Sequence, residues 1–337
     1  MSNADAPSTD GTFATHQAHD AFVKQWLSDT SQARILLQSY LPAEVCAWID
    51  WSTLRLDSTG HVKSSLAQTH SDILFVATLA GWPVEIGVLI EHQTTVDRFL
   101  RVRLLDYKVQ RWLRLIQESR PENERHQSRK LPVIITLVLH QGPDRWTPSR
   151  SLRDLFDIPA EAWPHLQSFV PDFTHELIDL SQAAPEDEDI AFELKATLKL
   201  MKLVRLEAAI EGFFDWLCAQ PQVLPSSLVL QLIRYVFAVR QHVDVDAIVH
   251  SLRPRIEYQS NMMTIEQMIE ARGETRGEAR GVALGEARGL VRGKLEMLRE
   301  MMGLPKIDPQ SLTALSLEAL QAAFTQLEAE YAARFKR

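Results

Sequence analysis

Cysteine is scarce in this chain, which has 337 residues and only two cysteines, Cys46 and Cys218. Two cysteines cannot form a disulfide framework, and neither belongs to the closely spaced pairs that zinc sites use. Long hydrophobic runs are also missing. The longest strongly apolar stretch covers residues 131–139, whereas a membrane-spanning helix needs about 20 apolar residues. The sequence therefore predicts a protein of the reducing cytoplasm that has no membrane partner.

The N-terminus lacks the basic and apolar regions of a signal peptide, and residues 1–15 are predicted to be a disordered leader. An overall excess of positive charge is missing too, since the formal net charge is −8 at pH 7. Such a balance disfavours a protein that coats nucleic acid non-specifically, but it is compatible with a local basic groove. Residues 98–130 have that local character, because ten Lys and Arg residues stand there against four acids.

The spacing of apolar residues predicts both helices and strands in the first half of the chain. Helical spacing covers 19–41, where Pro42 ends the helix, and continues in a short helix over 43–51. A longer polar-apolar helix is predicted over 95–117. The predicted strands cover 71–79, 85–91 and 131–140.

The order of these elements predicts the fold class and the domains. Helix, hairpin, helix and strand in succession indicate an α/β domain with a small mixed sheet flanked by helices, which we place at 16–180. After about residue 180 the chain changes to long amphipathic helices. We therefore predict a helical domain over 181–260 and a helical C-terminal region over 261–337.

The strand over 85–91 begins as buried core but ends at a polar run, Glu91, His92 and Gln93. Asp72, near the start of the preceding strand, lies as far before the Gly81-Trp82 pair as Glu91 lies after it. If that pair forms a two-residue hairpin loop, Asp72 and Glu91 face each other with Cβ atoms roughly 4.5–5.5 Å apart. Two facing carboxylates repel unless one of them is protonated or a cation lies between them. Oxygen ligands without cysteine favour Mg²⁺ or Mn²⁺ over zinc.

Each of these residues also has an alternative explanation in which it has a structural role and takes no part in metal binding or catalysis. Asp72 can simply begin a strand, and Glu91 can form an ion pair with Arg101 or Arg103 of the following helix. Because alternate residues of a strand point to opposite faces, His92 lies away from Glu91, which is typical of a packed or hydrogen-bonded histidine. His140 can likewise end a strand without any further role.

The wider pattern resembles the PD-(D/E)xK nuclease core in its E-x-Q variant. Within that superfamily it resembles the Rpn recombination-promoting nucleases, also called YhgA-like putative transposases. The resemblance covers about residues 16–180. The residues that carry it are His19-Asp20 with Phe22 and Lys24, Leu41-Pro42, SDILF at 71–75, LIEHQ at 89–93, Arg103 with Tyr107, Leu131-Pro132, and His140-Gln141-Gly142 with Trp146.

This resemblance implies a restriction-endonuclease-like core and a divalent-metal-dependent DNA endonuclease linked to recombination, mobile elements or defence. Asp72 and Glu91 would hold Mg²⁺ or Mn²⁺, helped by the backbone carbonyl of His92. Gln93 stands where most of the superfamily has lysine, and a glutamine orients water by hydrogen bonds without adding positive charge. The chain also departs from the family pattern at Ser71, where proline is usual, and around Gln141.

A DNA substrate requires cationic contacts to phosphates. Asp20 and Tyr107 are the candidate supporting residues, although Asp20 and Lys24 can also be an i,i+4 pair on one helix. The basic run can likewise be a solvated helix face. Two other function classes remain open, a DNA-binding or transposase-like accessory protein without cleavage and an assembly module. The candidate DNA contacts are Lys24, Arg98, Arg101, Arg103, Lys108 and Arg111.

Near the C-terminus, glycine recurs at every fourth residue. In one helix these positions form a slowly wrapping column, although each glycine costs up to about 1 kcal/mol of helix stability. Arginine and glutamate form similar columns, so like charges stack at i,i+4. These costs favour a helix with a partner, and we predict homo-oligomerisation through Gly273–Gly293. The alternative is a flexible charged linker. The glycines are Gly273, Gly277, Gly281, Gly285, Gly289 and Gly293.

Overall fold

The computed structural model describes residues 9–57, 71–118, 130–205, 210–240, 243–305, 307–308, 312 and 315–335. The chain divides into two compact units, residues 1–260 and residues 261–337. The first unit contains the sheet and the second contains most of the glycine-repeat helix.

Five strands form one mixed sheet in the order β1-β2-β3-β4-β5. Strands β1 to β3 pair antiparallel, and β3, β4 and β5 pair parallel. The predicted class, an α/β core followed by helices, is confirmed. The strands are β1 (Ile49–Leu56), β2 (Ser71–Leu79), β3 (Trp82–Gln93), β4 (Val133–His140) and β5 (Glu176–Asp179).

The β2–β3 hairpin has the predicted register but a different turn. Asp72 is the backbone partner of Glu91 in the antiparallel ladder. The two turn residues are Ala80 and Gly81 rather than Gly81 and Trp82. Gly81 adopts a φ of 77°, a left-handed conformation that glycine reaches without steric cost. An irregularity next to Thr78 then shifts the ladder, and this shift restores the pairing of Asp72 with Glu91.

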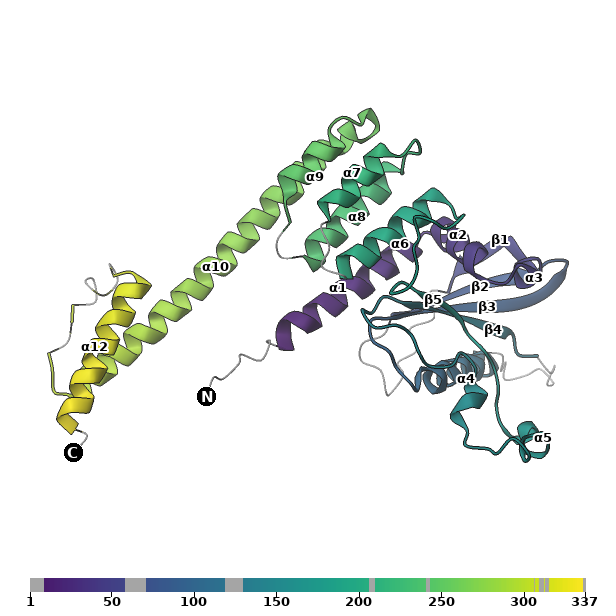
Figure 1. Ribbon diagram of the computed structural model, residues 1–337, viewed down its shortest axis with the longest axis horizontal. Coiled ribbons are helices and arrows are strands. Elements are labelled where there is room, and N and C mark those ends of the chain that lie inside the picture. The colour runs from purple at the N-terminus through teal and green to yellow at the C-terminus, as the bar shows by residue number, and fades with distance from the viewer. Residues whose placement is uncertain are drawn as a thin grey trace. The chain divides into compact units, whose positions relative to one another are not determined.

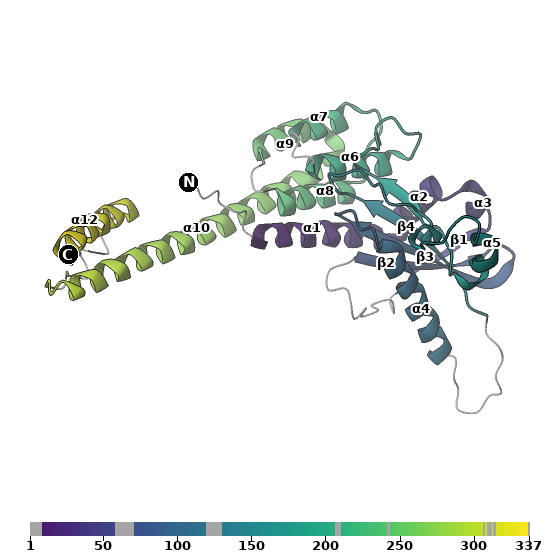
Figure 2. The ribbon, with the colours of Figure 1, turned by 60° about the horizontal axis from the view of Figure 1, so that its bottom comes forward.

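Helices cover both faces of the sheet (Figure 1). On one face α4 (Leu100–Glu118) packs through Leu104 onto Leu89 and Val138. The opposite face is covered by helices from both ends of this unit, as Figure 2 shows. These are α1 (Thr9–Leu27), α2 (Thr30–Tyr40), α6 (Phe192–Arg205) and α8 (Ser226–Val239).

Two helices differ from the sequence prediction. The helix predicted over 19–41 is interrupted after Leu27, because Asp29 caps a new helix by accepting a hydrogen bond of 2.8 Å from the Ser31 amide. The helix predicted over 43–51 ends at Cys46, and strand β1 begins at Ile49. The remaining helices are α3 (Ala43–Cys46), α5 (Trp163–Leu166), α7 (Glu211–Ala219), α9 (Val245–Leu252), α10 (Gln259–Met301) and α12 (Leu317–Phe335), with short 3-10 turns at Leu152–Leu155, Gln167–Phe169 and Ile256–Tyr258.

The glycine repeat lies within α10, a single helix of 43 residues, so the prediction of a helix rather than a linker is confirmed. In the second unit α12 packs on the end of α10, where Leu295, Leu298, Leu320 and Leu327 form a small core. A Cβ atom added at any of the six repeat glycines would meet nothing within 4 Å.

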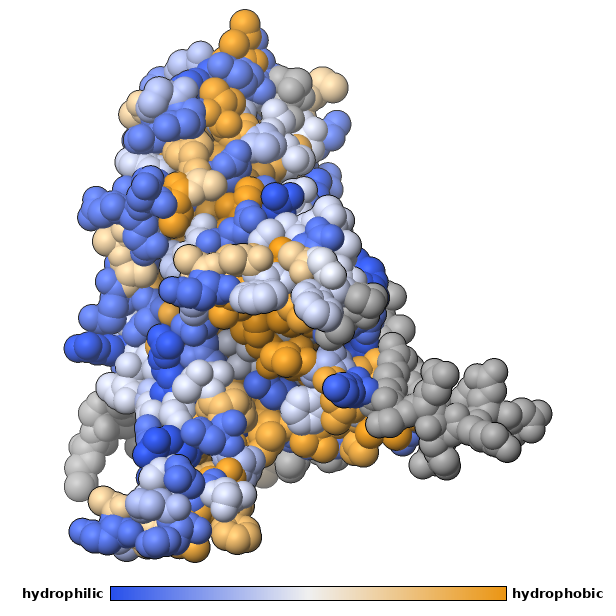
Figure 3. Space-filling view, turned by 90° about the vertical axis from the view of Figure 1, so that its right-hand side faces the viewer, coloured by the Kyte–Doolittle hydropathy of each residue, from blue (hydrophilic) through white to orange (hydrophobic). Residues whose placement is uncertain are grey.

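Apolar side chains are not confined to the core. Figure 3 shows them gathered in the middle of one face of the molecule. No helix in the described part of the chain is both long enough and apolar enough to cross a membrane.

Candidate active site at the end of strand β3

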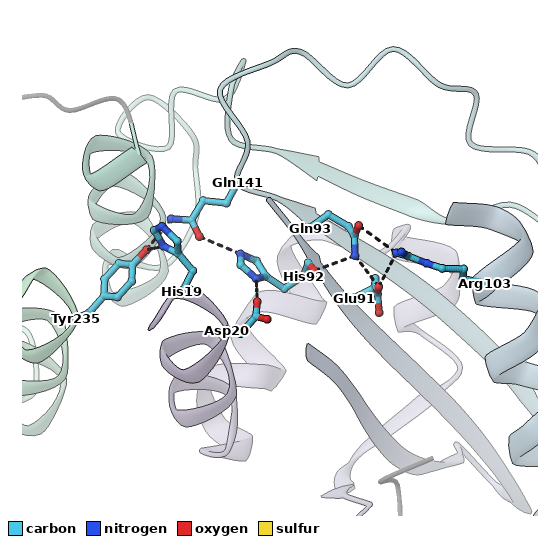
Figure 4. A network of polar contacts seen from close by, with 8 residues as sticks. All are labelled: His19, Asp20, Glu91, His92, Gln93, Arg103, Gln141 and Tyr235. Atoms are coloured by element: carbon cyan, nitrogen blue, oxygen red, sulfur yellow. Dashed lines mark hydrogen bonds and ion pairs between the residues drawn. The ribbon is translucent and has the colours of Figure 1, made fainter. Parts of the chain in front are cut away.

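Glu91 and Gln93 occupy the end of β3 and point toward α4, because alternate strand residues share a face. Both are almost fully buried, with exposed fractions of 4% and 2%. The Gln93 side-chain amide donates to Glu91 Oε1 at 2.6 Å and to the His92 carbonyl at 3.0 Å. Its amide group therefore has a fixed orientation, with the nitrogen on the carboxylate and the oxygen directed toward α4 (Figure 4).

Arg103 completes this cluster from α4. Its Nη2 donates to Gln93 Oε1 at 3.1 Å and lies 3.3 Å from Glu91 Oε1, while Nη1 lies 3.2 Å from an Asp97 oxygen. The sequence left the partner of Glu91 open between Arg101 and Arg103. The structure selects Arg103, which places a permanent positive charge beside the buried carboxylate and the amide of Gln93.

Asp72 approaches the same place from β2. Its backbone lies directly opposite Glu91, but its side chain is outside the described residues. The site therefore contains one described carboxylate with a second one opposite it in register. Among the described residues no cluster of three or more His, Cys, Asp or Glu side chains gathers in a metal-binding arrangement.

A second polar network lies on the opposite face of β3 and starts at His92, whose side chain is fully buried. His92 Nδ1 lies 2.7 Å from Asp20 Oδ1 on α1, and Nε2 lies 2.9 Å from Gln141 Oε1 after β4. The Gln141 amide nitrogen donates to the Met201 carbonyl of α6 at 2.8 Å and to the Tyr235 hydroxyl of α8 at 2.6 Å. Figure 4 shows the two networks side by side.

The Met201 carbonyl fixes the direction of the hydrogen bonds in this network, because a carbonyl oxygen can only accept a hydrogen bond. The Gln141 nitrogen must therefore face α6, so its oxygen faces His92 Nε2. His92 Nδ1 faces the Asp20 carboxylate, which is also an acceptor. Both ring nitrogens thus face acceptors, so the ring donates a hydrogen bond to Asp20, to Gln141 or to both.

Tyr235 anchors the other end of this network within the helices. Its hydroxyl also lies 2.6 Å from Nδ1 of His19, so it joins α1 and α8 to Gln141. Burial raises the pKa of Tyr235 above its ordinary value, and the hydroxyl keeps its hydrogen at neutral pH.

The family of this chain is evident from its similarity to known proteins. Residues 17–227 match the model of the family described as "Putative transposase, YhgA-like". The chain belongs to this family. It is 27% identical to the "Recombination-promoting nuclease RpnC" of Escherichia coli (strain K12) over 80% of this chain and 84% of that protein. It is 26% identical to RpnD of Escherichia coli O157:H7, which has the same descriptive name, over 76% of this chain and 95% of that protein.

Another relative is named as inactive. The "Inactive recombination-promoting nuclease-like protein RpnE" of Escherichia coli (strain K12) is 27% identical over 60% of this chain and 63% of that protein. No solved structure matches the chain.

In this member of the YhgA-like family, the other predicted site residues occupy different surroundings. Lys24 and Arg98 are exposed. Arg101 is buried and donates to the carbonyls of Ser151 and Arg98 at 2.7 and 3.0 Å, and burial lowers its pKa. Tyr107 is buried in the core between α4 and the sheet.

The two remaining basic candidates are also turned inward. Lys108 is 6% exposed and lies 3.8 Å from the centre of the Phe173 ring. Burial lowers its pKa to about 8. Arg111 forms a buried ion pair with Asp57 at 2.8 Å. The structure therefore brings Glu91, Gln93 and Arg103 together, whereas Arg101, Lys108 and Arg111 have contacts elsewhere along α4.

Sequence reasoning missed three contributors to the site. Asp97 forms an ion pair with Nη1 of Arg103, and its only sequence signal is its place just before the helix. Met201 and Tyr235 hold Gln141. No local pattern reveals them, because the contacts join residues 60 and 94 positions apart.

Proposed function

We propose that this protein is a divalent-metal-dependent endonuclease that hydrolyses DNA phosphodiester bonds in recombination, in mobile elements or in defence. The observation that carries the proposal is the pairing of Asp72 with Glu91 at the end of a buried strand, next to the fixed amide of Gln93. Two relatives over most of the chain are named recombination-promoting nucleases. Both cysteines are free, which fits the reducing cytoplasm.

The donors at this site suit Mg²⁺ or Mn²⁺. Glu91, Asp72 and the His92 carbonyl would supply only oxygen, and the buried Glu91 carboxylate favours a cation as neighbour. When bound, such an ion polarises the scissile phosphate and activates a water molecule.

The chain's own groups would orient the substrate and offset its charge. Gln93 is held by Glu91 and the His92 carbonyl, so its side chain is positioned to orient a water molecule. Arg103 would supply the positive charge that lysine supplies in most of the superfamily, since its guanidinium contacts Gln93 from α4. Lys24 and Arg98, which are exposed, are the candidate contacts to more distant phosphates.

The test is cleavage of supercoiled plasmid with Mg²⁺, Mn²⁺ or EDTA. We expect nicked or linear product only with a divalent ion, and a loss of about 100-fold or more in Glu91→Gln and Asp72→Asn. Glu85→Gln is the matched control, because Glu85 lies on the same strand in a surface pair with Arg55. Undiminished cleavage in EDTA, or in Glu91→Gln, would overturn the proposal.

A second candidate function is DNA binding without cleavage. It is favoured by the relative named inactive and by the glutamine at the position of the usual lysine. On this alternative, DNA binding measured by fluorescence anisotropy persists in Glu91→Gln, and no metal ion produces cleavage. The column Gly273–Gly293 remains our proposed site of self-association under either function, because its surface is open to the close approach of another helix.

A further inference from the structure

Helix α4 presents an unusual outer face. Its charged side chains Arg101, Lys108 and Arg111 are buried, whereas apolar side chains on the opposite side are exposed. A surface helix normally presents polar and charged side chains on its outer side, whereas α4 exposes apolar ones although Leu104 and Tyr107 also pack into the core. The exposed residues are Val102 (50%), Val109 (37%), Leu113 (46%) and Ile116 (43%), and Leu105 beside them is half-buried. We call these five residues the α4 stripe.

The α4 stripe is symmetric about Val109. Val102 and Ile116 each lie seven residues from Val109, and Leu105 and Leu113 each lie four residues from it. Steps of seven and four keep side chains on one side of a helix. In an antiparallel pair of identical helices with a two-fold axis at Val109, Val102 meets the partner's Ile116 and Leu105 meets the partner's Leu113. The stripe is therefore complementary to itself, as an isologous interface requires.

We propose that the α4 stripe binds the α4 stripe of a second copy of this chain in antiparallel orientation. The segment directly after α4, residues 119–129, contains no Leu, Ile, Val, Met, Phe, Trp or Tyr, so it offers no apolar group for this surface. The polar border is also compatible with the pairing. Asp106 would lie near the partner's Gln110, a donor for a carboxylate, so no like charges meet across that border.

Among the described residues, the apolar surface of this contact consists of the α4 stripe alone. Val133, at the start of β4, is exposed as well, but it precedes Ile134, which packs toward α4, so its side chain points to the other face of the sheet. The four exposed side chains of the stripe amount to roughly 300 Å² in each copy, or roughly 600 Å² in the pair, which is the size of a weak, transient contact. The stripe from Val102 to Ile116 is about 21 Å long. We therefore expect a weak, concentration-dependent dimer with micromolar affinity.

The test is cross-linking of the full chain, because the two-fold axis assigns a distance to each position. Cys46 and Cys218 are first replaced by serine, and single cysteines are then introduced on α4. A short bis-maleimide should join Val109→Cys to its own copy, because paired helices lie about 8–10 Å apart. Gln117→Cys is the control. It is also exposed, but its two copies would lie about 24 Å apart along the helix axes.

We expect about tenfold more covalent dimer from Val109→Cys than from Gln117→Cys, because proximity raises the effective concentration of the thiols. A mixture of Val102→Cys and tagged Ile116→Cys should give the mixed dimer in preference to either homodimer. Equal cross-linking of Val109→Cys and Gln117→Cys would overturn the proposal. This is also the result expected if the two copies associate through α10 alone. Cross-linking of Val102→Cys chiefly to itself would indicate parallel helices and would also overturn it.

A second measurement uses charge. In sedimentation velocity, Val102→Glu and Ile116→Lys should each weaken the α4 association, because each places a charge against an apolar partner. Mixing the two variants should restore the α4 association. In the mixed dimer the introduced carboxylate of one chain faces the introduced ammonium group of the other, and the second contact remains between valine and isoleucine. Failure of the mixture to associate more than either variant would contradict the antiparallel register. Neither experiment depends on DNA cleavage, so both can succeed or fail independently of the proposed function.

Discussion

Gln141→Met is the substitution that most directly tests the network behind β3. Methionine is close to glutamine in length but can neither accept from His92 nor donate to Met201 and Tyr235. The variant thus loses three hydrogen bonds of 2.6–2.9 Å in a fully buried place. The shape of the core is preserved, so the change acts mainly on polar pairing.

The magnitude follows from the groups that are left without a partner. His92 Nε2 loses its acceptor in an environment from which water is excluded, and an unsatisfied buried donor costs about 1–3 kcal/mol. The Tyr235 hydroxyl keeps its contact with His19, so its loss is smaller. We expect the free energy of unfolding to fall by about 2–4 kcal/mol. Tyr235→Phe should lower the free energy of unfolding by less, about 1–2 kcal/mol, because Gln141 retains its hydrogen bonds to the Met201 carbonyl and to His92.

Urea unfolding followed by far-ultraviolet dichroism gives these free energies, provided that the slope against urea is unchanged between variants. Gln182→Met is the control, because Gln182 is exposed and surface changes usually stay within about 0.5 kcal/mol. The double variant should show a coupling of about 1 kcal/mol between Gln141 and Tyr235. A cost for Gln141→Met no greater than that of the control would refute the reasoning.

Three further predictions concern the charges of α4 and the repeat helix. Gln93→Lys alone should lower plasmid cleavage, because the new cation would lie beside Arg103, whereas adding Arg103→Gln should restore it; equal activity of both variants would show that the two cations do not interact. The pKa of Lys108 is lowered from 10.5 to about 8, so the charged form of Lys108 destabilises the fold below about pH 8. This loss of stability becomes smaller as the pH rises from 8 toward 10.5. Lys108→Met should therefore raise the free energy of unfolding by about 2–3 kcal/mol at pH 7, with a smaller gain at pH 10, and a gain that does not depend on pH would contradict the assignment. Replacing Gly277, Gly281 and Gly285 with leucine should reduce the mass measured by light scattering if that column is an interface, and an unchanged mass would reject it.

The hairpin of the site was predictable because it depends on local rules. Alternation fixes which side of a strand each residue faces, so the distances of Asp72 and Glu91 from the turn were sufficient to pair them. The prediction placed the turn one residue too late, yet the register held because the irregularity next to Thr78 compensates. Strands β1 and β5 were not predicted. β5 has only four residues, too few for a periodic pattern to indicate a strand.

The partner of Glu91 could not be chosen from the sequence for a geometric reason. Arg101 and Arg103 lie two residues apart on one helix, so they point about 200° apart. Either can face the strand, depending on how the helix is rotated about its axis. That rotation is set by the packing of Leu104 and Tyr107 into the core, a tertiary contact. The same limit applies to Gln141 and Tyr235, which are far apart in sequence and share no local signal.

Strand β3 links the two halves of the site. Glu91 and Gln93 project toward α4 and His92 projects toward α1, so a displacement of His92 moves both of its neighbours. His92 is held through Gln141 by α6 and α8. The family match ends at residue 227, before Tyr235, the side chain that joins α8 to this network. The helices after the sheet are therefore connected through Gln141 to His92, the residue that lies between Glu91 and Gln93 on β3.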